Sequence, residues 1–335
     1  MKSIEARIDS FIRTGEGDFN RLACESFQHQ CRGNPAYGYY AATVYERWEA
    51  IKRWEEIPAL PIVAFKKSAV STFSVSEARK IFHSSGTTSA ARSSHYFKST
   101  NLYELSIIQG WPSRPSNRVR ILAHSHTPEE APDSSLIHMF QTLIDHFGDP
   151  QSDFVESHAD LAELLAFSQK EGCPVWLLGT ALALHRFLNH CETRKISFGF
   201  ESHLLAMETG GFKGLAEAIP LPHFYRRLRG TLGISMFSVL SEYGMCELSS
   251  QFYTRPGAEV RAFHAPPWVR WRIVHPLSGA PVPEAEKGVL EIFDLANVDS
   301  AIAIRTEDVA HAAEGGFVLD GRIRTAPQKG CSLTT

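Results

Sequence analysis

The feature that most constrains the fold is a strand–turn–helix unit in the middle of the chain. A short apolar run over residues 174–179 reaches the turn Gly179-Thr180, and helical periodicity follows at once over 181–189. A strand that is apolar on both faces is typical of a parallel sheet with helices on both sides, since neither face is left to water. The unit therefore predicts an α/β fold.

A second unit of the same kind lies upstream. Residues 118–124 alternate like a strand and enter a polar turn over 125–132. A helix is expected over 134–146, with Ser134 available as its N-cap. Two such units predict at least two neighbouring parallel strands with helices between them.

The remaining segments suggest four parts. Residues 1–56 read as helical, from apolar spacings of four (Ile4, Ile8, Ile12) and of three (Tyr45, Trp48, Ile51). The prolines in residues 57–65 predict an extended segment there. This segment begins an α/β core that is expected over residues 57–262. Short alternating strands over 268–274, 288–293 and 301–304 predict a β-rich subdomain over 263–324. The tail over 325–335 has almost no apolar content and is expected to be mobile.

Composition excludes several classes of function. The 335 residues are 43% hydrophobic and 21% charged, as in a globular enzyme with a large core. A formal net charge of −3 offers no basic stripe for nucleic acid. No segment reaches the roughly 20 apolar residues of a membrane span. Six cysteines without a CxxC spacing, and no signal peptide, predict free thiols in the cytoplasm.

A small, hydroxyl-rich stretch over residues 83–93 follows the apolar pair Ile81-Phe82. A strand opening into such a loop presents N–H and O–H donors with little bulk, which suits phosphate oxygens. Arg92 and Lys98 could add positive charge nearby. The alternative is a flexible, serine-rich surface loop.

His124 and His126, two residues apart, would share one face of a strand, and we interpret them as structural or substrate-facing rather than as metal ligands.

Five short elements follow one another along the chain. They are Ser84-Ser85-Gly86-Thr87-Thr88, Glu208-Thr209-Gly210-Gly211, Tyr243-Gly244-Met245-Cys246-Glu247, Thr306-Glu307-Asp308 and Gly321-Arg322. In this order they resemble the adenylate-forming superfamily of acyl- and aryl-activating ligases, in particular the LuxE-type acyl-protein synthetases, or long-chain-fatty-acid–protein ligases. Further matching pieces are Leu60-Pro61 with Phe65-Lys66, Ser134-Ser135-Leu136 with Met139, Gly179-Thr180, and the segments 210–214, 266–270 and 329–333.

The resemblance implies a fold like the N-terminal domain of adenylate-forming enzymes, with mixed and parallel sheets covered by helices. It also implies ATP and Mg²⁺ as cofactors. The implied nucleotide-binding residues are Ser84, Ser85, Gly86, Thr87, Thr88, Gly210, Gly211, Tyr243, Gly244, Met245, Cys246, Asp308 and Arg322. Among them Tyr243 would pack beside adenine, Asp308 would accept hydrogen bonds from the ribose hydroxyls, and Arg322 would contact ribose or phosphate. Glu247 would hold Mg²⁺, and Thr87 would take part in catalysis at the phosphates.

Two departures from the superfamily pattern stand out. The residue before the motif glutamate is normally threonine, and here it is Cys246, whose thiol is a poor donor. Adenylation could then be slower, or Ser249 could supply the hydroxyl. The large C-terminal domain with a catalytic lysine is expected to be absent, as in the short LuxE-type enzymes.

The resemblance also implies an acyl acceptor. Cys331 lies on the tail between Gly330 and Ser332, where LuxE-type enzymes carry the cysteine that accepts the acyl group. A thiolate attacks an acyl-adenylate readily. His124 and Thr180 are the expected substrate-side residues. The reaction that the resemblance implies is activation of a carboxylic acid, expected to be a fatty acid, to acyl-AMP, transfer to Cys331, and delivery to a partner such as an acyl reductase.

Two alternatives stay open. The acyl group could pass directly to a carrier-protein or coenzyme A thiol, or to an amine. Alternatively, because of Cys246, the chain could be an inactive adenylate-binding docking module.

Overall fold

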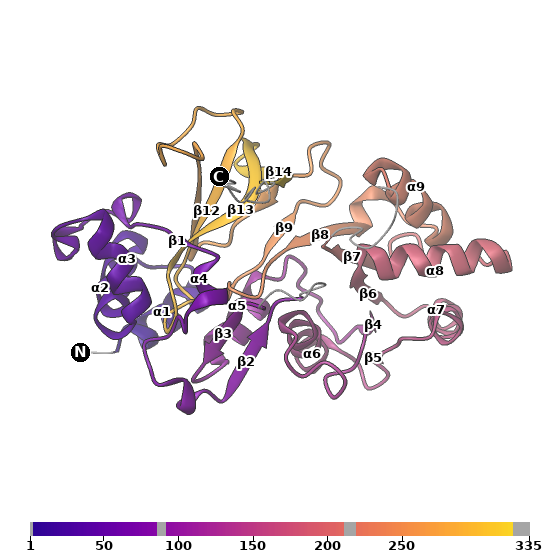
Figure 1. Cartoon of the computed structure of the whole chain (residues 1–335). Helices are drawn as coiled ribbons and strands as arrows, with labels where there is room; N and C mark the ends of the chain where they lie inside the picture. The colour runs from indigo at the N-terminus through magenta and orange to yellow at the C-terminus, as the bar shows by residue number, and fades with distance from the viewer. Residues whose placement is uncertain (1–2, 86–91, 211–218, 324–335) are drawn as a thin grey trace, which may run out of the picture.

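The computed structural model describes residues 3–85, 92–210 and 219–323. The N-terminal helices and helices α7–α9 lie at opposite ends of the molecule, with strands between them (Figure 1). Within the described residues, no helix is both long enough and apolar enough to cross a membrane.

The N-terminal part is helical, as predicted, up to residue 44. It forms α1 (Ile4–Thr14), α2 (Phe19–Gly33) and α3 (Pro35–Val44). The helix expected from Tyr45, Trp48 and Ile51 is wrong, because the chain leaves α3 at Tyr45 in an extended conformation. Only two single 3₁₀ turns follow, Trp48–Ala50 and Trp54–Glu56, and a spacing of three fits the 3₁₀ period.

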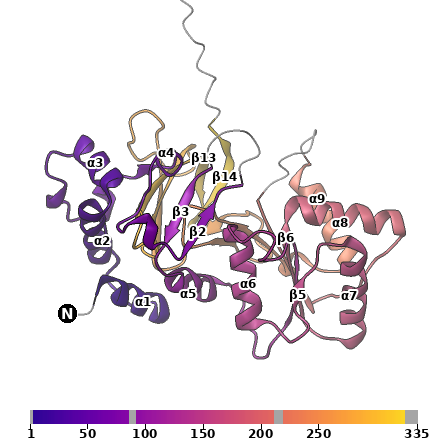
Figure 2. The same ribbon diagram turned by 60° about the horizontal axis from the view of Figure 1, so that its bottom comes forward.

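The extended segment predicted over 57–65 is confirmed only in part. Strand β1 comprises Leu60–Pro61, and the chain then turns at Val63 into the short helix α4 (Ala64–Lys67). A hairpin of β2 (Lys80–His83) and β3 (Ser94–Phe97) and helix α5 (Asn101–Gly110) follow. Figure 2 shows this hairpin between the N-terminal helices and α6 (Ser135–Phe147).

The predicted parallel sheet is confirmed. Its strands are β4 (Arg120–His124), β5 (Asp153–Phe154), β6 (Val175–Thr180), β7 (Leu204–Thr209) and β8 (Val239–Tyr243), in spatial order β5-β4-β6-β7-β8. The helices between them are α6, α7 (His158–Glu171), α8 (Ala181–Arg194) and α9 (Leu221–Leu232). The Ser134 side chain caps α6, as expected.

Both faces of this sheet are buried. Leu177 and its same-face neighbours pack with Leu161, Phe187 and Phe224 of α7, α8 and α9. Trp176 and Leu178 point the other way and pack with Phe140 and Tyr103 of α6 and α5. The two-sided burial explains why the central positions of β4, β6 and β7 are apolar on both faces.

The C-terminal strands are antiparallel and extend the same sheet. They are β9 (Phe252–Thr254), β10 (Phe263–His264), β11 (Val269–Val274), β12 (Gly288–Asp294), β13 (Ala303–Ala313) and β14 (Gly316–Arg322). Strand β9 pairs with β8, and β10 bridges β9 and β14. The predicted boundary near residue 262 therefore falls within one continuous sheet, and the division into four parts stays a prediction.

The N-terminal helices pack against these C-terminal strands. Phe27 and Tyr37 belong to the same buried cluster as Phe293 and Ile304. The buried Gln30 side chain donates to the Asn297 carbonyl oxygen (2.7 Å) and accepts from the Ile302 N–H (2.8 Å). These contacts hold the first and last thirds of the described chain together.

Candidate active site

The carboxyl ends of the parallel strands form one edge of the sheet. His124 is in register with Gly179, Thr180 with Thr209, and Thr209 with Glu242. In open α/β sheets, ligands bind in the crevice outside this edge. The sequence-predicted residues His124, Thr180 and Gly210 therefore share the edge where a substrate is expected.

Next to this edge, three of the predicted nucleotide residues are in direct contact. The Tyr243 hydroxyl at the end of β8 donates to Asp308 Oδ2 on β13 (2.8 Å). Arg322 on β14 donates from Nε to Asp308 Oδ1 (2.7 Å), and the two residues are a cross-strand pair. Burial and the Asp308 charge raise the pKa of Tyr243 well above its ordinary value, so its hydroxyl stays protonated as a donor.

Glu247 lies in the loop after β8, and its side chain is buried. The Asn297 side chain donates to the Glu247 carbonyl oxygen (2.9 Å) and fixes the backbone there. Burial raises the pKa of the Glu247 carboxyl, while the Ser93 hydroxyl and the charges of Lys66 and Arg322 act in the opposite direction. A buried carboxylate with cations around it is a candidate for a functional group.

The hydroxyl-rich stretch reaches the same place through its two ends. The Ser84 N–H donates to the Ser93 carbonyl oxygen (3.1 Å), and the Ser93 N–H donates to Ser84 Oγ (3.0 Å). Arg92 donates to the Ser84 carbonyl oxygen (2.6 Å) and pairs with Asp133 (3.0 Å). The buried Ser93 hydroxyl lowers the pKa of the Glu247 carboxyl, which brings this end of the stretch near the loop after β8, although Ser93 Oγ has no hydrogen-bond partner among the described residues. Ser85 is the last described residue before the gap and is exposed.

Comparisons with known proteins identify the family and the fold. The family model for acyl-protein synthetase, LuxE, matches residues 143–335. This chain belongs to the LuxE acyl-protein synthetase family. The match includes Tyr243, Glu247, Asp308, Arg322 and Cys331, but not the stretch over 83–93.

A curated relative is the long-chain-fatty-acid–luciferin-component ligase of Aliivibrio fischeri, with 24% identity over 178 residues. The alignment covers 50% of this chain and 46% of the relative, so the LuxE-family chain matches about half of that protein's length.

Solved structures of adenylate-forming enzymes share the fold. An open conformation of 2-hydroxyisobutyryl-CoA ligase in complex with 2-HIB-AMP and CoA has a TM-score of 0.67 at 12% identity, covering 91% of this chain and 70% of that one. ATP-bound MatB from Rhodopseudomonas palustris has a TM-score of 0.55 at 17% identity, and the match covers 76% of this chain and 49% of MatB. The predicted fold class is confirmed.

Cys246 departs from the threonine of the superfamily pattern, and its environment in the LuxE-family chain is apolar. Burial raises the pKa of the Cys246 thiol well above its ordinary value, so the thiol stays protonated. Its carbonyl oxygen accepts from Nδ1 of the buried His95 (2.9 Å). Ser249, the suggested substitute, is fully buried, and its N–H donates to Asp294 Oδ2 (3.0 Å). Its role as a substitute stays a prediction.

The two expected substrate-side residues have partners within the protein. His124 Nδ1 hydrogen-bonds to the Val155 carbonyl oxygen (2.7 Å), and burial lowers the pKa of the ring. Thr180 Oγ1 accepts from the Ala183 N–H (3.1 Å) and caps α8. Both residues stay predictions as substrate ligands. The predicted Gly86, Thr87, Thr88, Gly211 and Cys331 lie outside the described residues.

Sequence reasoning did not single out Ser93, Lys66 and His95 as site residues. Lys66 was part of a family-matching piece, and Ser93 closes the hydroxyl-rich stretch, so both had a signal in the sequence. His95 had none, because only the fold brings β3 beside the loop after β8.

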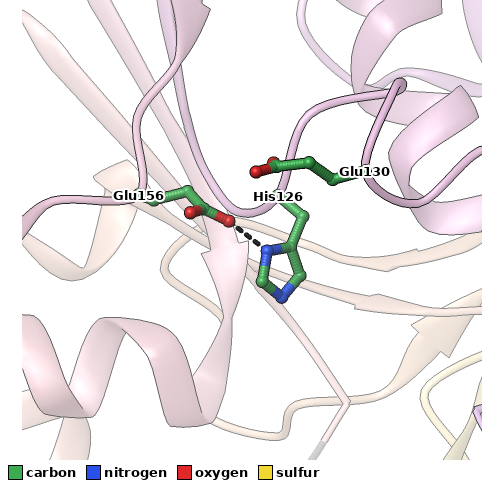
Figure 3. A group of neighbouring side chains, drawn as sticks. All are labelled: His126, Glu130 and Glu156. Carbon is green, nitrogen blue, oxygen red and sulfur yellow. Dashed lines mark ion pairs between the residues drawn. The ribbon is translucent and has the colours of Figure 1, made fainter.

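A group of three other side chains could hold a metal ion. His126, Glu130 and Glu156 point toward one another (Figure 3), with ligand atoms within 4.8 Å of one another. His126 pairs with Glu156, and Glu130 accepts from the Thr127 N–H (2.9 Å). All three are exposed, and such groups are common on surfaces without a metal, so we assign them no role.

Glu242, at the end of β8, is a buried acid beside the site. The Thr209 hydroxyl donates to its carboxyl group, and a Cβ at Gly244 would clash with it. Burial raises the pKa of Glu242 from 4.5 to about 7. Between these values the unfolded chain has lost the proton while the folded chain keeps it, so stability falls as pH rises.

We therefore expect a pH-dependent gain from Glu242→Gln. From pH 4 to pH 8, the unfolding free energy of the wild type should fall by about 3 kcal/mol relative to that of the variant, given ~1.4 kcal/mol per pKa unit. Urea denaturation of both proteins at several pH values measures this difference. Burial also raises the pKa of Asp294, to about 6. Asp294 titrates in both proteins, so its contribution cancels in the difference between their unfolding free energies. A difference that stays constant with pH would contradict the assignment.

Proposed function

We propose that this chain activates a carboxylic acid with ATP and transfers the acyl group to its own Cys331. The observation that carries the proposal is the hydrogen-bonded group of Tyr243, Asp308 and Arg322, with the buried Glu247 near enough for the Arg322 charge and the Ser93 hydroxyl to lower its pKa. It combines an aromatic ring, a paired acceptor, a cation, a buried carboxylate and hydroxyl donors. Groups of these kinds suit a nucleotide with its phosphate chain.

In the first step, a carboxylate oxygen of the acid attacks the α-phosphorus of ATP. The bond from that phosphorus to the bridging oxygen breaks, and pyrophosphate leaves with the electron pair. The protein's contribution is positioning and charge stabilisation. Asp308 would accept from the ribose hydroxyls, Tyr243 would lie beside adenine, and Ser84 and Ser85 would donate to phosphate oxygens together with Gly86, Thr87 and Thr88.

Glu247 fits the role of a Mg²⁺ ligand. Its carboxylate oxygens suit a hard cation, and burial raises its pKa, so an added positive charge would favour the ionised form. Mg²⁺ supplies neutralisation of phosphate charge when bound.

In the second step, the Cys331 thiolate attacks the acyl carbon of acyl-AMP. A thioester forms, and AMP leaves with the electron pair of the broken acyl–oxygen bond. Lys329 is two residues away and would favour the thiolate. A long-chain fatty acid is supported by the name of the Aliivibrio fischeri relative. An acyl reductase as the onward partner and a cytoplasmic location are part of the same proposal.

The test is incubation of the wild-type protein with ATP, Mg²⁺ and a panel of acids. We expect acid-dependent ATP–pyrophosphate exchange and, on the peptide of residues 330–335, a mass gain equal to the acid minus water. Exchange without that gain would favour transfer to a carrier-protein thiol, coenzyme A or an amine. No exchange with any acid would leave the inactive docking module as the better description.

A further inference from the structure

We infer that Lys66 binds the phosphate chain of the nucleotide and is a catalytic residue of the adenylation step. The inference rests on the proposed function and adds a residue from a part of the chain that lies before the family match.

The segment that carries Lys66 is tied to the strand that carries Asp308. Leu60 and Pro61 of β1 pair in parallel with Ile304 and Arg305 of β13. The Ile62 N–H then donates to the Arg305 carbonyl oxygen (3.0 Å). The segment after β1 therefore stops running beside β13 at Arg305, three residues before Asp308. It then turns directly into α4.

The residue before Lys66 anchors α4 on the loop that carries Glu247. Phe65 is buried, and its ring packs edge-on against the His95 ring with centroids 5.8 Å apart. His95 Nδ1 hydrogen-bonds to the Cys246 carbonyl oxygen (2.9 Å), and Nε2 to Ser300 Oγ (3.0 Å). Burial lowers the pKa of His95 to about 4, so this anchor stays neutral and donates to the carbonyl oxygen at neutral pH.

The position of Lys66 leaves its charge available to a ligand. The side chain is exposed, and within the described ranges its ammonium group forms no hydrogen bond or ion pair. Its charge nevertheless reaches the buried Glu247. Arg322, the other cation acting on Glu247, already donates to Asp308. Lys66 is therefore a cation at this place whose three donors all lack a partner among the described residues, whereas Arg322 has its Nε engaged by Asp308.

An ammonium group here suits the chemistry of the first step. It offers three donors to phosphate oxygens and no acceptor. Charge builds on the phosphate oxygens as the carboxylate approaches and pyrophosphate departs, and a fixed positive charge lowers that barrier. Arginine at this position would keep the charge, whereas alanine would remove it.

The test compares Lys66→Ala and Lys66→Arg with Lys67→Ala, its matched control from the next exposed position of α4. Direct binding of ATP and of adenosine is measured without acid, so the result does not depend on turnover. We expect Lys66→Ala to weaken ATP binding by about 10- to 100-fold, the value of a charge-assisted hydrogen bond, and to leave adenosine binding unchanged. Lys66→Arg should recover most of the affinity, and Lys67→Ala should match the wild type.

Two results would overturn the role of Lys66. One is equal ATP affinity in Lys66→Ala and Lys67→Ala. The other is a parallel loss of ATP and adenosine affinity, which would mean that the substitution disturbs the fold instead. Failure of the proposed function looks different, because the wild type would then show no acid-dependent exchange whether or not ATP binding requires Lys66.

Discussion

Glu247→Gln should lower acid-dependent pyrophosphate exchange by at least about 100-fold while leaving the fold intact. The amide keeps the size of the side chain and removes the charge proposed to hold Mg²⁺, and loss of one positioned charge of this kind costs about 10²–10³ in rate. Because burial raises the pKa of Glu247, the fold itself favours an uncharged group there. The melting temperature should therefore stay the same or rise.

The measurement is exchange as a function of Mg²⁺ concentration, with thermal unfolding recorded on the same samples. Glu163→Gln, an exposed glutamate on α7, is the matched control and should behave as the wild type. Exchange that survives in Glu247→Gln at ordinary Mg²⁺ concentrations would remove Glu247 from the site.

Cys331→Ser should abolish hydroxylamine-sensitive acyl labelling and retain exchange. The first step does not use the thiol, whereas the second step needs a thiolate, and a serine hydroxyl is a far weaker nucleophile at neutral pH. Intact mass after incubation with ATP, Mg²⁺ and the preferred acid measures the label, and pyrophosphate exchange measures activation.

A matched control tests whether any cysteine would accept the acyl group. Cys173 is the least buried cysteine in the described part of the chain, and Cys173→Ser should label like the wild type. Labelling that persists in Cys331→Ser would exclude Cys331 as the acceptor, without affecting the evidence for adenylation.

Periodicity and turn chemistry predicted two of the parallel strands, β4 and β6, and the helices α6 and α8 that follow them. The runs ending at His124 and Thr180 are buried on both faces, and their short length and the turn residues after them distinguish them from helices. The segment after Val44 was misjudged because a spacing of three is compatible with both a helix and 3₁₀ turns. Single 3₁₀ turns depend on tertiary packing, here of Trp48 against Phe27.

The candidate site was predictable where a motif carried it. Tyr243 and Asp308 were singled out from short motifs, and the fold brings them into a hydrogen bond across 65 residues of sequence. Lys66 and His95 could not be assigned in this way, because their proximity to Glu247 follows from the pairing of β1 with β13 and the packing of β3. Long-range pairing of this kind leaves no local periodicity in the sequence.

The continuous sheet makes the two ends of the chain depend on each other for folding. A fragment ending at residue 262 would leave β9 without β10 and β1 without β13. It would also expose the apolar residues of α2 and α3 that the last strands cover. The residues proposed to bind the nucleotide thus lie in one unit that spans the described chain, so we expect them to be positioned only once both halves have folded together.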